Sequence, residues 1–305
     1  MHPAPSIIIF TTLSGLGYGL AAVLGLGLLD PAAFATGIAW LAALAMIGGG
    51  LLSSTLHLGN PQRAWRALSQ WRSSWLSREG VMAVLTFVPL LWSAVAAAWF
   101  GRWSPLAGLA GSAMCLVTVF CTGMIYASLR AIDAWHTRLT PVCYVLFAVA
   151  GGLTLATSFA AISGAPLSFL ALASILAQAA AWWAKHLWWN RLDAQSARSS
   201  PETATGLGAL GRVKLFERPH FNDNYLTREM GFGVARKHAA KLRRIALISG
   251  AAAPAAFLVI AAASDGFTWL AVPAALAAAM LHAAGILVER WLFFAEARHS
   301  VMNYY

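Results

Sequence analysis

The chain has 305 residues, of which 59% are hydrophobic and only 10% are charged. Helices of a soluble protein rarely stay apolar on every face for long, so this composition excludes a water-soluble fold. The formal net charge of +10 does not indicate nucleic-acid binding, because the basic residues lie in alternate loops between long apolar stretches.

Eight uncharged stretches follow one another along the chain. A helix needs roughly 20 apolar residues to cross a bilayer, and each stretch can supply one such helix. The longest gap, from Arg138 to Lys185, is divided into two helices at residues 163–166. The sequence therefore predicts an all-α integral membrane protein with a single domain over residues 1–305. The predicted helices are 5–29, 34–57, 79–100, 105–129, 141–162, 167–187, 243–264 and 268–291.

The first predicted helix is retained in the mature protein, because it lacks a basic leader and is longer than a signal-peptide core. Within it, Gly15 and Gly19 have the spacing of small residues that let membrane helices approach closely. A nucleotide-binding loop is not indicated, because no strand precedes these glycines.

The short loop after the second helix has a distinct pattern. Asn60 and Pro61 resemble an N-cap and a first helical residue. In residues 62–75, Trp65, Leu68 and Trp71 fall on roughly one face, which predicts a helix that lies flat in the membrane interface.

The basic residues predict the orientation of the chain. Of the 21 Lys and Arg residues, only Arg102 lies on the side opposite to the other 20. The positive-inside rule therefore places both termini in the cytoplasm. The same side carries the cytoplasmic loop 185–244, in which 194–211 are predicted to form a flexible linker and 230–244 a basic helix. That helix can contact anionic lipid or a partner subunit.

His57 and Glu79 are the first candidates for chemistry. They lie at the end of one predicted helix and the start of the next, so both occupy the same depth on the cytoplasmic side. An imidazole and a carboxylate in this position can bind a quinone and move its protons. The alternative is that they are interfacial polar residues, satisfied by water or by Arg63 and Arg78.

Other residues carry weaker signals. Tyr126, Arg130 and Trp135 can complete a quinone pocket, or they can anchor the chain at the interface. No metal site or disulfide is predicted, because the three cysteines lie in predicted helices without CxxC spacing. Haem is not expected, because His282 has no second histidine at the same depth.

Three segments are similar to one known family. Residues 54–65 read STLHLGNPQRAW, residues 76–79 read LSRE, and residues 289–296 read ERWLFFAE. Together with the eight predicted helices, they resemble the DmsC family, the membrane-anchor subunits of dimethyl sulfoxide reductase-type molybdoenzymes. The resemblance extends over nearly the whole chain.

The resemblance implies the function, the cofactors and the partners. A member of this family anchors a molybdopterin catalytic subunit and an iron–sulfur subunit in the bacterial inner membrane, and it exchanges electrons with ubiquinone or menaquinone. The quinone-site histidine and glutamate of the family match His57 and Glu79. The anchor itself has no metal and no catalytic residue. Residues 185–244 and 59–78 are expected to dock the iron–sulfur subunit.

The predicted orientation narrows the choice within the family. In such complexes the histidine side faces the iron–sulfur subunit, so a cytoplasmic His57 implies cytoplasmic catalytic subunits. This resembles the sulfite dehydrogenase branch, SoeC, in which sulfite oxidation reduces quinone. The alternative is an anchor that oxidises quinol for dimethyl sulfoxide reduction. A transporter is less favoured, because nearly every charge lies at the end of a predicted helix.

Overall fold

A computed structural model describes residues 3–55, 60–195, 199–214, 216–217, 234–264 and 266–304. These residues form helices and no strands. The long elements are α1 (Pro5–Gly25), α2 (Phe34–Thr55), α3 (Trp75–Phe100), α4 (Pro105–Ala127), α5 (Leu139–Ile162), α6 (Ser168–Ala194) and α11 (Thr268–Ala295), with α9 (Val234–Leu247), η3 (Ile248–Ala252) and α10 (Ala253–Ala263) in one run. The short elements are η1 (Pro61–Gln70), α7 (Pro201–Thr205), η2 (Leu207–Ala209) and η4 (Ser300–Asn303).

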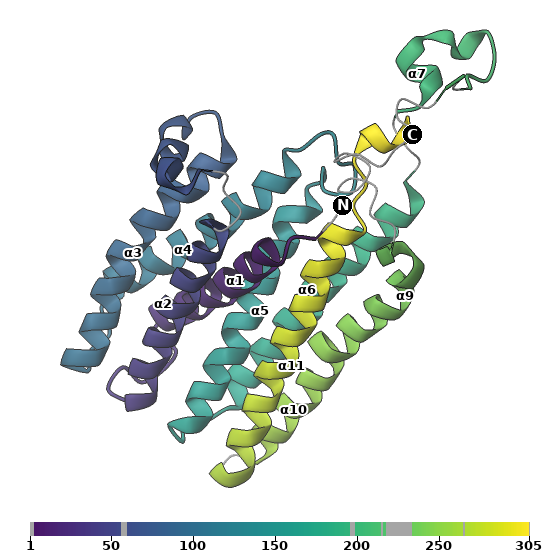
Figure 1. Cartoon of the computed structure of the whole chain (residues 1–305). Helices are drawn as coiled ribbons and strands as arrows, with labels where there is room; N and C mark the ends of the chain where they lie inside the picture. Colours follow the sequence, from purple (N-terminus) through teal and green to yellow (C-terminus); the bar gives the residue numbers. More distant parts are fainter. Residues whose placement is uncertain are drawn as a thin grey trace.

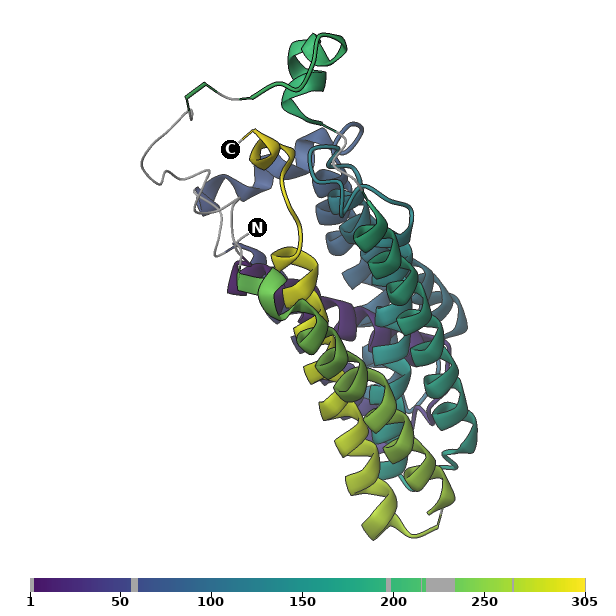
Figure 2. The same cartoon turned by 90° about the vertical axis from the view of Figure 1, so that its right-hand side faces the viewer.

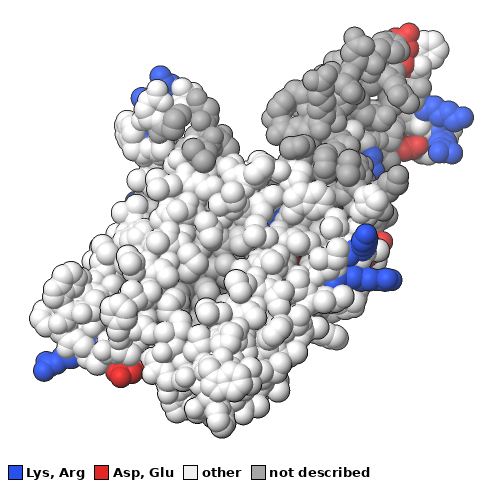
Figure 3. Space-filling model, turned by 60° about the horizontal axis from the view of Figure 1, so that its bottom comes forward, with Lys and Arg blue, Asp and Glu red and all other residues white. Residues whose placement is uncertain are grey.

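The long helices form a bundle with two distinct ends. Figure 1 shows both chain termini at the end that also carries η1 and α7, here called the η1 end. The turned view in Figure 2 shows the same arrangement, with the helices roughly side by side. The face seen in Figure 3 is broadly uncharged, and its Lys, Arg, Asp and Glu side chains gather at the margins. This distribution suits a body immersed in lipid.

Seven helices within the described residues are long and apolar enough to cross a membrane. They correspond to seven of the eight predicted helices, and their bounds agree with the prediction to within a few residues at most ends. The eighth predicted helix is α6, which has 27 residues. It is less apolar because it contains Gln178, Lys185 and Arg191 as well as several tryptophans, so the count of eight crossings stays a prediction.

α1 lies at the centre of the bundle. Most of its residues are buried, and α2, α4 and α5 pack around it. At its crossing with α5, a Cβ atom on Gly19 would overlap the carbonyl group of Ala148, and one on Gly152 would overlap the backbone of Gly19. Gly19 thus has the predicted packing role, whereas Gly15 has no atom within 4 Å of an added Cβ.

Several predicted helix ends differ from the observed ends, and α6 and α11 extend beyond the prediction. α6 continues to Ala194 rather than 187, and α11 continues to Ala295 rather than 291. Lys185 and Glu289 were expected near helix ends, because charged residues usually lie at the membrane surface. In the structure their side chains are buried in the bundle and form an ion pair with each other, so these charges do not mark the ends of the helices.

The loops also differ from the expectation. The predicted interfacial helix after Pro61 is a 3₁₀ helix, η1, and the side chains of Trp65 in it and of Trp71 directly after it are exposed. The predicted linker 194–211 contains α7, because Ser200 and Thr203 form a capping box and Pro201 occupies the first helical turn. The predicted basic helix is present as α9, which begins at Val234.

Candidate functional site

Glu79 is a buried carboxylate in the second turn of α3. Its side chain faces α4, where the hydroxyl of Thr122 donates a hydrogen bond to Oε1 at 2.8 Å. α3 begins at Trp75 because Ser74 accepts a hydrogen bond from the backbone N–H of Ser77 as its N-cap. This start places Glu79 inside the bundle, near the η1 end, rather than at its surface.

η1 is fastened to the first turn of α3 beside this carboxylate. The hydroxyl of Ser77 donates to the carbonyl of Ala67. The guanidinium of Arg78 donates to the carbonyls of Trp71 and Arg72, at 3.0 and 2.7 Å. These bonds fix the loop that follows the family motif relative to Glu79.

The structure separates the predicted site residues into two groups. Glu79, Tyr126 and Trp135 are near one another, because Thr122 and Tyr126 lie one turn apart on α4 and Tyr126 contacts Trp135 at 5.3 Å between ring centroids. Arg63 and Arg130 have exposed side chains, and Arg78 holds η1. His57 lies outside the described residues, so its pairing with Glu79 stays a prediction.

Tyr126 is the centre of an aromatic cluster. Its ring stacks on Tyr144 of α5 at 5.7 Å and makes edge contacts with Phe293 and Phe294 of α11. Trp135 stacks on Phe293 at 5.4 Å and donates its indole N–H to the carbonyl of that residue at 2.9 Å. The cluster therefore joins α4 and α5 to α11.

A cluster of buried charges adjoins these rings, and the sequence analysis did not assign it a role. Lys185 Nζ lies 2.6 Å from Glu289 Oε1, and Arg290 Nη1 lies 3.5 Å from Glu289 Oε2. The guanidinium of Arg290 covers the ring of Tyr144 at 3.7 Å, and Lys185 covers Trp188 at 3.8 Å. The sequence contains one signal for this cluster, since three charged residues adjoin long apolar stretches, but the same pattern is typical of helix ends.

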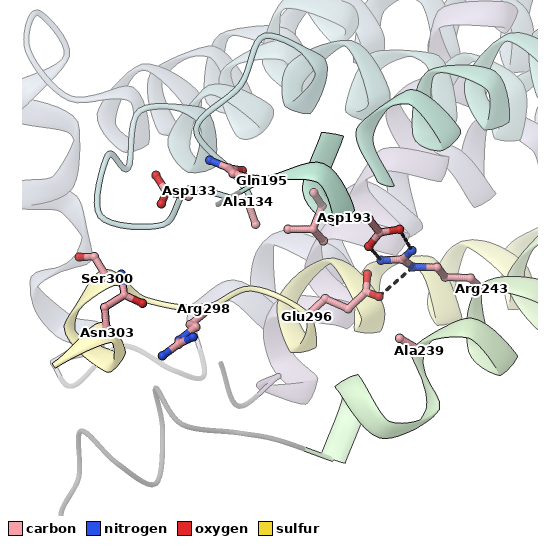
Figure 4. Close-up of a pocket in the computed structure, with 11 residues that line it drawn as sticks. Asp133, Ala134, Asp193, Gln195, Ala239, Arg243, Glu296, Arg298, Ser300 and Asn303 are labelled. Atoms are coloured by element: carbon pink, nitrogen blue, oxygen red, sulfur yellow. Dashed lines mark hydrogen bonds and ion pairs between the residues drawn. The ribbon is translucent and has the colours of Figure 1, made fainter. Parts of the chain in front are cut away.

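A polar pocket of about 450 Å³ opens at the η1 end between α6, α9 and the C-terminal segment (Figure 4). Arg243 binds both carboxylate oxygens of Asp193, at 2.6 and 2.9 Å, and Glu296 at 2.9 Å. Burial raises the pKa of the Glu296 carboxyl, although Arg243 acts in the opposite direction. None of the described candidates for the quinone site lines this pocket.

His282 of α11 is buried and forms a hydrogen bond to the backbone of a neighbouring helix. Nδ1 of His282 lies 2.6 Å from the carbonyl oxygen of Gly250 in η3, a π-helical turn. A carbonyl oxygen only accepts, so Nδ1 carries the hydrogen. The hydrogen bond links α11 to η3, the π-helical turn between α9 and α10.

Two comparisons with known proteins give the family. The profile of the family described as DMSO reductase anchor subunit (DmsC) matches residues 1–208. The chain is also 33% identical over 342 aligned residues to the C subunit of the sulfite dehydrogenase of Allochromatium vinosum, and the alignment covers 100% of this chain and 99% of that protein. The matched region contains Glu79, Thr122 and Tyr126. The chain therefore belongs to the DMSO reductase anchor subunit (DmsC) family.

Proposed function

We propose that this chain anchors a molybdenum and iron–sulfur oxidoreductase in the bacterial inner membrane and passes its electrons to quinone. The observation that carries the proposal is the buried Glu79 carboxylate, which follows the family motif and is held by Thr122. A protonatable group beside aromatic rings suits a quinone, because the rings pack on its apolar face and the carboxyl exchanges protons with its oxygens.

Quinone reduction defines what the site has to do. Two electrons arrive from the iron–sulfur subunit, two protons are added, and two O–H bonds form on the quinone. Glu79 delivers a proton to one quinone oxygen, His57 delivers the second proton to the other, and both groups are reprotonated from the cytoplasmic water. Ubiquinone and menaquinone both have these oxygens. The substrate is oxidised on a molybdopterin subunit, so the role proposed for this chain is electron and proton transfer to quinone.

Sulfite is the proposed electron donor, because the similar protein of Allochromatium vinosum is a sulfite dehydrogenase subunit. The second candidate is an anchor that oxidises quinol for dimethyl sulfoxide reduction, which the family description favours. Purifying the complex, identifying the two partner subunits and assaying both directions distinguishes them. Sulfite-dependent quinone reduction supports the first candidate, and quinol-dependent dimethyl sulfoxide reduction supports the second.

Replacing either group of the proposed quinone pair tests its role. In Glu79→Gln and in His57→Gln, we expect quinone turnover to fall by about 10²–10⁴-fold, the typical contribution of a proton-transfer group. Activity with a soluble electron acceptor should stay unchanged, because the metal centres are in other subunits. Glu202→Gln is the matched control, since Glu202 is a partly exposed carboxylate on α7 and is not one of the proposed quinone-site residues. Wild-type quinone kinetics in both variants of an intact complex would refute the assignment.

The proposal includes eight membrane crossings, with α6 as one of them, and both termini in the cytoplasm. It is supported by the 20 basic residues on one side and by the position of both chain ends at the η1 end (Figure 1). With Ser199→Cys and, separately, Ser163→Cys, an impermeant thiol reagent added to intact cells should label only position 163. The native cysteines are buried. Labelling at position 199 from outside would reverse the orientation.

A further inference from the structure

The buried charge cluster of Lys185, Glu289 and Arg290 has two cations and one anion. The side chains are at most 3% exposed. Lys185 and Arg290 share the single carboxylate of Glu289, at 2.6 and 3.5 Å, so these three side chains together have one positive charge in excess. Ionised groups inside a membrane bundle are costly, and replacing such groups by apolar ones is often neutral or stabilising. Stability alone therefore does not explain this cluster.

Arg290 faces the proposed quinone site through two aromatic rings. Its guanidinium lies on Tyr144, and Tyr144 stacks on Tyr126. Tyr126 in turn lies one turn after Thr122, whose hydroxyl is bonded to Glu79. A charge in this position acts strongly, because the intervening rings exclude water and the effective dielectric constant is low.

The other side of Arg290 adjoins a small cavity of about 10 Å³, which is close to the volume that one water molecule needs. Thr12 of α1 and Tyr144 also line it. The Nε atom of Arg290 and the hydroxyl of Thr12 are buried and have no hydrogen-bond partner among the described residues. The guanidinium is thus not fully engaged by Glu289, and it shares this cavity with the unpartnered hydroxyl of Thr12.

We propose that Arg290 supplies a buried positive charge to the quinone site, and that Lys185 and Glu289 position it. The inference rests on the proposed quinone function. The uncancelled charge favours binding of quinone species that carry negative charge, including the anion formed when the first electron arrives. Arg290 acts on the quinone through its electric field and does not touch it.

Two naphthoquinones that differ in charge test the proposal in the purified complex. 2-Hydroxy-1,4-naphthoquinone is an anion at neutral pH, and 2-methyl-1,4-naphthoquinone is neutral and of similar shape. The measured quantity is the ratio of their dissociation constants. A unit charge at about 10 Å with an effective dielectric constant of about 20 changes affinity roughly tenfold. A purely structural role would change both affinities together.

Each single substitution has a predicted sign. Arg290→Gln and Lys185→Met should each reduce the preference for the anion by about tenfold or less, whereas Glu289→Gln should increase it. Arg290→Lys keeps the charge and should retain most of the preference. Gln178→Leu is the matched control, because it removes a buried polar side chain of α6 without changing charge. If one variant does not assemble, the direction of the change in the ratio of dissociation constants in the remaining variants tests the proposal.

An unchanged ratio, or a change of the wrong sign, would overturn the role of the cluster while leaving the proposed function intact. Failure of the wild-type complex to bind either naphthoquinone in competition with quinone is a different result. It would contradict the quinone function itself, and the inference with it.

Discussion

At the scale of single residues, the proposed quinone chemistry depends on the environment of one carboxylate. Glu79 could be proposed from the sequence because the family motif and its position between two apolar stretches both pointed to it. Thr122 could not, because threonines are common in membrane helices and nothing in the spacing distinguishes it from Thr118 one turn earlier. Only the packing of α4 on α3 places the hydroxyl of Thr122, and not that of Thr118, against Glu79.

Thr122→Val tests this distinction. Valine has the shape of threonine without the hydroxyl, so Glu79 loses a hydrogen-bond donor in a buried place. Hydrogen bonds to charged groups contribute about 1.5–3 kcal/mol, so kcat/KM for quinone should fall by roughly tenfold or more. Thr118→Val is the control, because Thr118 is equally buried but its hydroxyl contacts Thr86 instead. Equal kinetics in the two variants would contradict a role for the hydroxyl.

At the scale of helices, the bundle was predictable from the lengths of the uncharged stretches, because lipid requires long apolar helices with internally satisfied backbones. The ends of α6 and α11 were not predictable in the same way. A charge normally marks the membrane surface, but Lys185 and Glu289 neutralise each other across two helices. The partner of each charge is more than 100 residues away in the sequence. The predicted end of the second helix at 57 lies outside the described residues, so that helix end stays a prediction.

Packing of α1 on α5 gives a prediction at this scale. Gly19→Ala should destabilise the bundle by about 1–3 kcal/mol, because the added methyl group overlaps the backbone of α5 at Ala148. Gly15→Ala, one turn away in the same helix, should have little effect, because nothing lies within 4 Å of its Cβ position. Thermal unfolding in detergent, followed by near-ultraviolet circular dichroism, measures the difference. A drop of similar size in both variants would mean that helix propensity or lipid contact, not this crossing, determines the result.

At the scale of the whole molecule, charge is separated between the two ends of the bundle. Lys241 and Arg244 of α9 are exposed near the η1 end, whereas Arg243 is engaged by Asp193 and Glu296. The side chain of Ser77 bonds η1 to the first turn of α3, next to Glu79, and Figure 1 shows α9 on the side of the bundle away from α3. If the iron–sulfur subunit docks at the η1 end, as the proposed electron path requires, the free basic side chains of α9 are available to it.

Reversing these two charges tests the docking surface. In Lys241→Glu with Arg244→Glu, retention of the partner subunits during purification should fall most at low salt, where screening is weakest, and the difference from wild type should shrink as salt rises. Arg102→Glu is the control, because Arg102 is the single basic residue on the opposite side. Arg243 is left unchanged, since its ion pairs hold α9 to α6 and α11 and their loss would disturb the fold. Full retention of the partners at low salt in the double variant would assign the basic face of α9 to lipid instead.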